Sequence, residues 1–255
     1  MSLEDSTRGL PRGTPGQLVL LLLGLALAVL WPFALERASA AFGARGVGLA
    51  LALASAVSLA LTRTALPAPL RLHPAAQLGL LALSAFALTT GDGVALRLVP
   101  AWVQLAVASV FLRSLRSGPP VIERAVFWIQ PHAPDFIRPY CRTETLLWGA
   151  LFSLNGAAIG ALALFAPTET WRWFASIGAW LLVAALSAFD FLFRKLYFRL
   201  YGGGPIDALL ARWFPPNHSD VSRLANTYRT QMRLSLGRDP KTGKPSAGRG
   251  QQLEP

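Results

Sequence analysis

Residues 146–165 read LLWGALFSLNGAAIGALALF, twenty consecutive positions without a charged side chain. A helix of this length spans about 30 Å, the thickness of the hydrocarbon core of a lipid bilayer. The segment just before it, Arg113–Thr143, holds five arginines. The pattern predicts a membrane-spanning helix beside a positively charged connection.

Five more apolar stretches accompany this one, two of them on the short side for a bilayer. All but one of the 24 Lys and Arg residues fall outside the six stretches, the exception being Arg97. We therefore predict an all-α, polytopic membrane protein with about six transmembrane helices and additional short interfacial helices. The expected spans are Gln17–Leu35, Val47–Thr62, Pro74–Thr90, Val94–Leu112, Leu146–Phe165 and Phe174–Phe193.

The distribution of positive charge predicts the orientation of these helices. If the N-terminus is cytoplasmic, 20 of the 24 basic residues lie on the cytoplasmic side and four on the other. The positive-inside rule then places both termini in the cytoplasm. Arginine far outnumbers lysine, which is typical of a GC-rich bacterial source and favours a bacterial inner membrane. The net charge of +11 is explained by arginines that flank apolar segments and meet anionic lipid, so we expect no nucleic-acid partner.

The chain divides into a disordered cytoplasmic leader (1–16), a transmembrane domain (17–200), a cytoplasmic amphipathic extension (201–236) and a disordered tail (237–255). An Ala38-Ser39-Ala40 motif resembles a signal-peptide cleavage site, which leaves open whether the first span is removed. Against cleavage, Trp31-Pro32 and Glu36-Arg37 separate the motif from the end of the apolar run.

Three short cytoplasmic segments have the spacing of amphipathic helices. In the interfacial loop 113–143, Val121–Gln130 is predicted to lie in the headgroup layer, with Glu123 and Arg124 opposite its apolar side; a plain connecting loop is the alternative. Ile206–Phe214 forms the second segment, and the third begins after Ser219, which can cap it. The third segment's apolar face is formed by Val221, Leu224, Ala225, Tyr228 and Met232.

Polar side chains within the spans are the first functional candidates. Asn155 lies mid-span, and we favour an interhelical hydrogen bond over contact with a substrate. The small residues Gly149, Gly156 and Gly160 around it predict close approach of another helix. Asp190 can form an i,i+4 ion pair with Arg194, the alternative being a functional carboxylate.

A second candidate lies at the cytoplasmic face, where Arg138, Tyr140, Arg142 and Glu144 follow a Pro-rich connection. Paired arginines can bind a carboxylate or phosphate at two points, although anchoring to lipid phosphates explains them nearly as well. The three histidines do not share metal-ligand spacing, and the single cysteine excludes an internal disulfide. We predict no metal, no cofactor and no catalytic residue, and the sequence leans away from an enzyme.

One family resemblance covers about Leu112–Phe198. The residues 134–143 (PDFIRPYCRT), then Thr145, Trp148 and Asn155, and the stretch Asp190–Phe198 resemble uncharacterised bacterial inner-membrane proteins. That family is encoded in clusters for aryl polyene and xanthomonadin-type lipids, beside fatty-acid-synthase-like enzymes. Asp190 stands where the family is expected to carry a glutamate. The resemblance implies a lipid-biosynthetic setting without implying a reaction.

Three functions follow as hypotheses. The first is a non-catalytic accessory or scaffold protein, bound to membrane lipids, that holds acyl-carrier-linked biosynthetic enzymes at the membrane. The second is a transporter or flippase of a lipid-like product, suggested by Asn155 and Asp190. The third is an integral-membrane acyl or glycosyl transferase that uses the Tyr140–Glu144 region. A polar cavity at the bilayer midplane favours the second, and closed packing favours the first.

Overall fold

The computed structural model describes residues 15–64, 74–129, 133–199, 201, 204–215 and 219–235. Within these ranges the chain is helical and contains no strand, which confirms the all-α prediction. The predicted tail, the three histidines and all but the last two positions of the predicted leader lie outside them. The helices are α1 (Pro15–Thr64), α2 (Pro74–Thr90), α3 (Gly93–Arg97), α4 (Val99–Ser114), α5 (Val121–Ile129), the 3₁₀ turn η2 (Asp135–Ile137), α6 (Arg138–Phe165), α7 (Thr168–Trp173), the π-helical turn η3 (Phe174–Gly178), α8 (Ala179–Phe198), α9 (Pro205–Trp213) and α10 (Asp220–Ser235).

Four of the described helical segments are long and apolar enough to cross a bilayer. They are Leu30–Ala60, Gly93–Ser114, Asp135–Phe165 and Thr168–Phe198. Three of the four contain one predicted span each: the fourth, the fifth and the sixth. The coarse prediction of a membrane protein with several transmembrane helices is therefore supported.

The predicted count of six spans is not confirmed, because the helices that contain the first three predicted spans differ from the expectation. The first and second predicted spans both lie in α1, which is broken only at Gly43, where φ is 71° and ψ is 166°. A positive φ is easily adopted by glycine alone, so the chain can turn there without a loop. The third predicted span matches α2, whose 17 residues reach about 26 Å, short of a 30 Å core.

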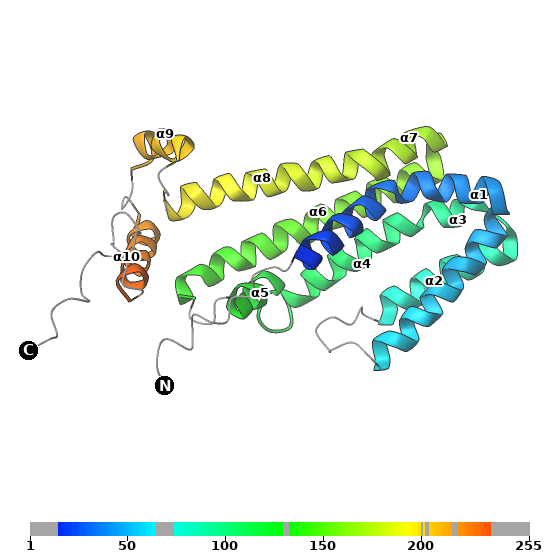
Figure 1. Ribbon diagram of the computed structural model, residues 1–255, viewed down its shortest axis with the longest axis horizontal. Helices are drawn as coiled ribbons and strands as arrows, with labels where there is room; N and C mark the ends of the chain where they lie inside the picture. The colour runs from blue at the N-terminus through cyan, green and yellow to red at the C-terminus, as the bar shows by residue number, and fades with distance from the viewer. Residues whose placement is uncertain are drawn as a thin grey trace, which may run out of the picture. The chain divides into compact units, whose positions relative to one another are not determined.

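The helices belong to two compact units. The first comprises Met1–Pro131 and Cys141–Ala184, and the second His132–Tyr140 and Ala185–Pro255. In the first unit α1 turns at Gly43, and its second half runs back beside α2 (Figure 1). The core of this unit includes Leu35 from α1, Leu96 from α3 and Trp171 from α7.

Small residues allow the helices of the first unit to approach closely. A Cβ atom added at Gly48 of α1 would lie 2.9 Å from the backbone nitrogen of Leu88 and 3.0 Å from the carbonyl oxygen of Ser84, both on α2. A Cβ at Gly79 would overlap the ring of Trp102 on α4. Membrane helices associate through such contacts, since burial of apolar surface gives little driving force in lipid.

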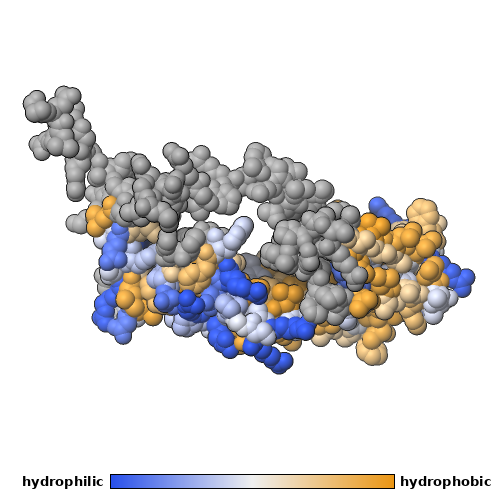
Figure 2. Space-filling model, turned by 90° about the horizontal axis from the view of Figure 1, so that it is seen from below, coloured by the Kyte–Doolittle hydropathy of each residue, from blue (hydrophilic) through white to orange (hydrophobic). Residues whose placement is uncertain are grey.

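Part of the outer surface of the first unit is apolar. In Figure 2 an extended orange area covers the right-hand end of the view, where the second half of α1 and α2 lie in Figure 1. Large apolar side chains on α1 and α2 remain about half exposed or more, and a water-soluble domain would bury most of them. They include Leu49, Leu53, Val57, Leu78 and Phe86.

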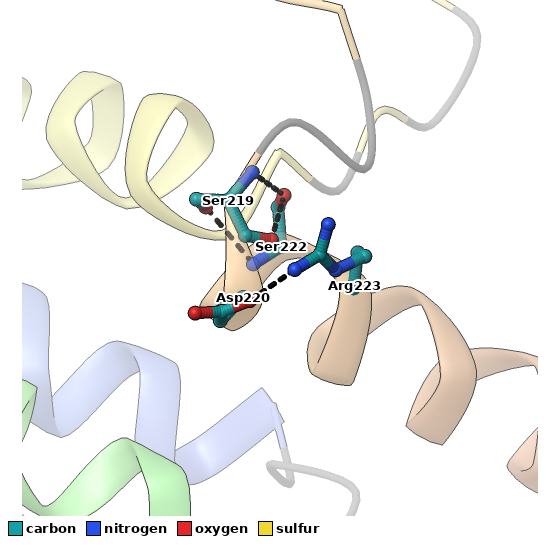
Figure 3. Close-up of polar contacts among 4 residues, drawn as sticks. All are labelled: Ser219, Asp220, Ser222 and Arg223. Atoms are coloured by element: carbon teal, nitrogen blue, oxygen red, sulfur yellow. Dashed lines mark hydrogen bonds and ion pairs between the residues drawn. The ribbon is translucent and has the colours of Figure 1, made fainter.

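The second unit holds the extension that follows α8. Ser219 and Ser222 cap the start of α10 reciprocally: the Ser222 backbone N–H donates to Oγ of Ser219 at 3.2 Å, and the Ser219 N–H donates to Oγ of Ser222 at 3.0 Å (Figure 3). The predicted cap is therefore confirmed. Asp220 and Arg223 form an ion pair one turn apart, also visible in Figure 3. On the predicted apolar face, Ala225 and Val221 pack inward, whereas Leu224 and Met232 stay exposed.

The other two predicted amphipathic helices also form, as α5 and α9. In α5, Glu123 is buried and Trp128 is 78% exposed; in α9, Asp207 is buried and Trp213 is 74% exposed. Glu123 lies opposite the exposed apolar side, as predicted, and a carboxylate can be buried there once it has polar partners. Its apolar neighbours can then face a lipid environment.

Candidate functional site

The hydroxyl of Tyr140 lies at the centre of a polar network in the second unit. Tyr140 is in the first turn of α6 and is only 8% exposed. Its hydroxyl donates a hydrogen bond to Oδ1 of Asp190 on α8, and Oδ2 of the same carboxylate accepts from Arg194. The i,i+4 pair predicted for Asp190 and Arg194 is therefore present. The structure brings together Tyr140 and Asp190, which the sequence offered as separate candidates.

Aromatic packing holds the Tyr140 ring in place. Its centroid lies 6.3 Å from the stacked ring of Phe193 and 5.7 Å from that of Tyr197. The ring of Phe198 meets it edge-on at 5.2 Å. Such pairs each contribute about 0.5–1.5 kcal/mol beyond their burial. The aromatic packing consequently fixes the hydroxyl toward Asp190.

Arg138 also belongs to the second unit, at the start of α6. Its Nε donates to Oδ1 of Asp135 at 2.8 Å, and the two side chains are 51% and 85% exposed. An ion pair this exposed contributes little to stability, about 0–1 kcal/mol, because water and salt screen it. The guanidinium therefore lies in a place that headgroups or solvent can reach.

The other two members of the predicted cytoplasmic site lie in the first unit. Nη2 of Arg142 donates to the carbonyl oxygen of Leu115 at 3.2 Å, which satisfies a carbonyl just beyond the last turn of α4. Glu144 is only 2% exposed. The structure thus divides Arg138, Tyr140, Arg142 and Glu144 between the two units, two residues in each.

Asn155 lies deep in the first unit, where it is 1% exposed. Its Nδ2 donates to the carbonyl oxygen of Ala179 at 3.3 Å, linking α6 to the start of α8. Ala179 directly follows η3, where the backbone closes a wider, π-type turn. The Asn155 amide therefore forms a hydrogen bond between α6 and α8 at this irregular turn, as predicted for an interhelical contact.

The three glycines predicted to pack against a helix lie along one side of α6. A Cβ at Gly149 would lie 2.7 Å from Leu112, and one at Gly156 would lie 2.8 Å from Leu105 and 3.1 Å from the carbonyl oxygen of Ala101. At Gly160 the nearest atom, Cβ of Ala101, is 3.7 Å away, an ordinary contact. All three therefore face α4, but an added Cβ atom would come closer than 3.0 Å to a neighbouring side chain only at Gly149 and Gly156.

Arg97, the one basic residue within the predicted spans, has a partner in another helix. Its Nη1 donates to Oγ1 of Thr168 at 3.1 Å, which links α3 to α7. The nearby Asp92 caps α3 by accepting from the backbone N–H of Val94 at 2.8 Å.

Two ion pairs had no signal in the sequence. Lys195 of α8 pairs with Asp207 of α9, whose side chain is 7% exposed. Arg172 of α7 pairs with Glu36 of α1, and its guanidinium lies 5.5 Å from the ring centre of Phe33. Separations of 12 and 136 residues match no local periodicity, so only the fold reveals them. Among the described residues, no three His, Cys, Asp or Glu side chains are grouped to hold a metal ion.

Comparison of the chain with family models, with curated proteins and with solved structures finds no match. The resemblance to aryl polyene and xanthomonadin-type membrane proteins is therefore a prediction that rests on the sequence motif.

Proposed function

We propose that this chain is a non-catalytic accessory protein of a bacterial inner membrane, which holds acyl-carrier-linked enzymes of a lipid-like biosynthetic pathway at the cytoplasmic face. In this proposal six spans place both termini in the cytoplasm, and the pathway is of the aryl polyene type. The observation that carries the proposal is the Tyr140–Asp190–Arg194 network. Tyr140, which carries the only phenol of this network, is buried, and its hydroxyl already donates to a carboxylate. This is expected of a network that supports a docking surface.

The composition of the second unit supports the choice of partner. Within residues 133–140 and 185–235 the chain has eight Lys and Arg residues and four acids, Asp135, Asp190, Asp207 and Asp220. All four acids are paired with basic residues. A surface with surplus positive charge favours an acidic partner through electrostatic complementarity, mainly by accelerating association.

The short helices support a position at the membrane surface. Trp128 of α5 and Trp213 of α9 are the most exposed of the described tryptophans, and tryptophan is enriched where headgroups meet the hydrocarbon core. Both helices bury their acid and expose their aromatic side. This arrangement fits helices that lie in the headgroup layer.

The topology can be tested first with reporter fusions. A periplasm-active reporter fused after Phe165 should be active, and one fused after Arg199 should be inactive. The proposed orientation places the connection between the first two spans outside, so a fusion at Ala41 should also be active. The opposite pattern would overturn the cytoplasmic assignment of the second unit.

The function can be tested by charge reversal on α9. Arg212→Glu should reduce co-purification of the pathway's acyl-carrier enzymes with the full chain in mild detergent, together with product formation. Arg116→Glu, an exposed arginine just beyond α4, is the matched control and should change neither. Tyr140→Phe should retain product formation once protein levels are equalised. Loss of product with unchanged enzyme binding in Tyr140→Phe would instead indicate a transferase.

A further inference from the structure

Four buried polar atoms lie where α1 packs against the α7–η3 segment, and none has a hydrogen-bond partner among the described residues. They are Nε1 of Trp31, Nε1 of Trp171, Nε of Arg172 and Oγ of Ser176. Trp171 is 1% exposed and Ser176 is fully buried. Native proteins leave few buried polar groups unsatisfied, and four on one packing face call for an explanation.

The four atoms belong to two segments of the first unit that are in contact. Trp31 and Trp171 contribute to the same core cluster, and α1 contacts η3 directly. The ion pair between Glu36 and Arg172 joins the two segments at the same place. Ser176 lies within the π-helical turn, a wider form of helix that occurs often at functional sites.

The chemistry of the atoms specifies the ligand. The two indole N–H groups and the guanidinium N–H can only donate, so a ligand must offer acceptor oxygens. Arg172 is already paired with Glu36, and a second carboxylate, Glu169, lies 3.9 Å away. One positive and two negative charges repel an anion. A neutral acceptor therefore fits, either water or a carbonyl oxygen.

We propose that this face binds the acyl ester carbonyls of a lipid. Its surroundings suit an acyl chain, because apolar side chains line the same contact, among them Leu35, Phe174 and Ala175. Two tryptophans, one arginine and one serine then donate to the ester oxygens. This site is independent of the proposed partner surface in the second unit.

The first test needs no variant. The full chain is purified in detergent and incubated with a phosphatidylethanolamine that carries two ester-linked chains, or with its diether analogue of equal chains and headgroup. Because the diether lacks both carbonyls, it should be retained about tenfold less, as measured by native mass spectrometry. Equal retention would overturn the proposal and leave water as the partner of the four donors.

The second test removes a single donor. Ser176→Ala should lower retention of the diester about fivefold and leave retention of the diether unchanged. Ser84→Ala is the matched control, since Ser84 is equally buried but its Oγ donates to the carbonyl of Leu80 at 2.7 Å. Equal losses in both variants, or none in Ser176→Ala, would contradict a specific site.

Two further arms identify the source of the carbonyl. A fatty-acid methyl ester should displace the retained diester, whereas the ionised free fatty acid should not; displacement by the free acid alone would refute the choice of a neutral group. Extraction of the purified chain then shows which lipid it carries from the cell. A bulk phospholipid or an ester product supports the site, and a lipid without any carbonyl overturns it.

Discussion

The two polar clusters of this molecule differ in how their hydrogen bonds are satisfied. In the second unit, both oxygens of Asp190 accept bonds, one from the Tyr140 hydroxyl and one from Arg194. In the first unit, the α1–α7–η3 face leaves four buried donors unpaired among the described residues. A satisfied network stabilises the fold, and an unsatisfied one indicates a ligand or water.

The comparison also separates what holds each unit together. The second unit depends on a few polar bonds around an aromatic cluster. The first depends on close helix contacts, such as Gly156 against α4. Substitutions at polar positions should therefore be costly in the second unit and inexpensive at the α1–α7–η3 face.

The largest effect is expected from Asp190→Ala. This change leaves the buried Tyr140 hydroxyl without its acceptor and Arg194 without its counter-ion, so the second unit should lose about 2–3 kcal/mol. The figure stays below that of a fully buried pair because the Arg194 side chain is 58% exposed. Thermal unfolding of the purified chain, monitored through proteolysis of the second unit, measures this loss of stability.

Asp190→Asn is the control, since an amide oxygen can still accept from Tyr140. Asp190→Asn should therefore lose only about half as much stability as Asp190→Ala. If Asp190→Ala unfolds like the parent chain, the network does not stabilise the second unit and the comparison fails.

The next effect tests close packing in the first unit. Gly156→Ala places a methyl group 2.8 Å from Leu105, which should destabilise the unit by about 1–3 kcal/mol. Gly160→Ala has room, with its nearest neighbour at 3.7 Å, and should be neutral or slightly stabilising because alanine favours a helix. Equal melting temperatures of the two variants would show that α6 and α4 separate at this point.

Much of this could be predicted from the sequence, and the remainder could not for physical reasons. Apolar runs bounded by arginine predict membrane helices because the bilayer imposes both features. The Asp190–Arg194 pair follows from helical spacing alone. The bonds from Tyr140 to Asp190 and from Glu36 to Arg172 join distant segments, and no spacing rule reaches across 50 or 136 residues.

The merging of two predicted spans into α1 has a similar cause. A hydropathy pattern marks where apolar runs end, but it does not say whether the connection is a loop or a single glycine turn. At Gly43 a positive φ breaks the helix, and the two halves join there without a loop. The inward direction of Glu123 and Asp207 likewise depends on partners that only the fold supplies.

A smaller effect is expected from Glu36→Gln. Glu36 is paired with Arg172, but its side chain is 43% exposed, so loss of the charge should cost about 0.5–1 kcal/mol. The loss should shrink at high salt, where exposed charges are screened. Melting curves at low and high ionic strength measure both quantities. A salt-independent loss above that range would mean that this ion pair stabilises the first unit as strongly as Asp190 stabilises the second.

The smallest effect, and the sharpest test of the comparison, is expected from Ser176→Ala in chain freed of lipid. The Ser176 hydroxyl is buried without a partner among the described residues, so its removal deletes an unsatisfied group and should change stability by less than about 0.5 kcal/mol, in either direction. Ser84→Ala deletes an equally buried hydroxyl that does have a partner, and should cost about 0.5–1.5 kcal/mol. Adding the diester lipid should then raise the melting temperature of the parent chain more than that of Ser176→Ala, since a ligand stabilises only the form that binds it. If Ser176→Ala proves as costly as Ser84→Ala without lipid, its hydroxyl has a structural partner, and the α1–α7–η3 face is satisfied in the same way as the Tyr140 network.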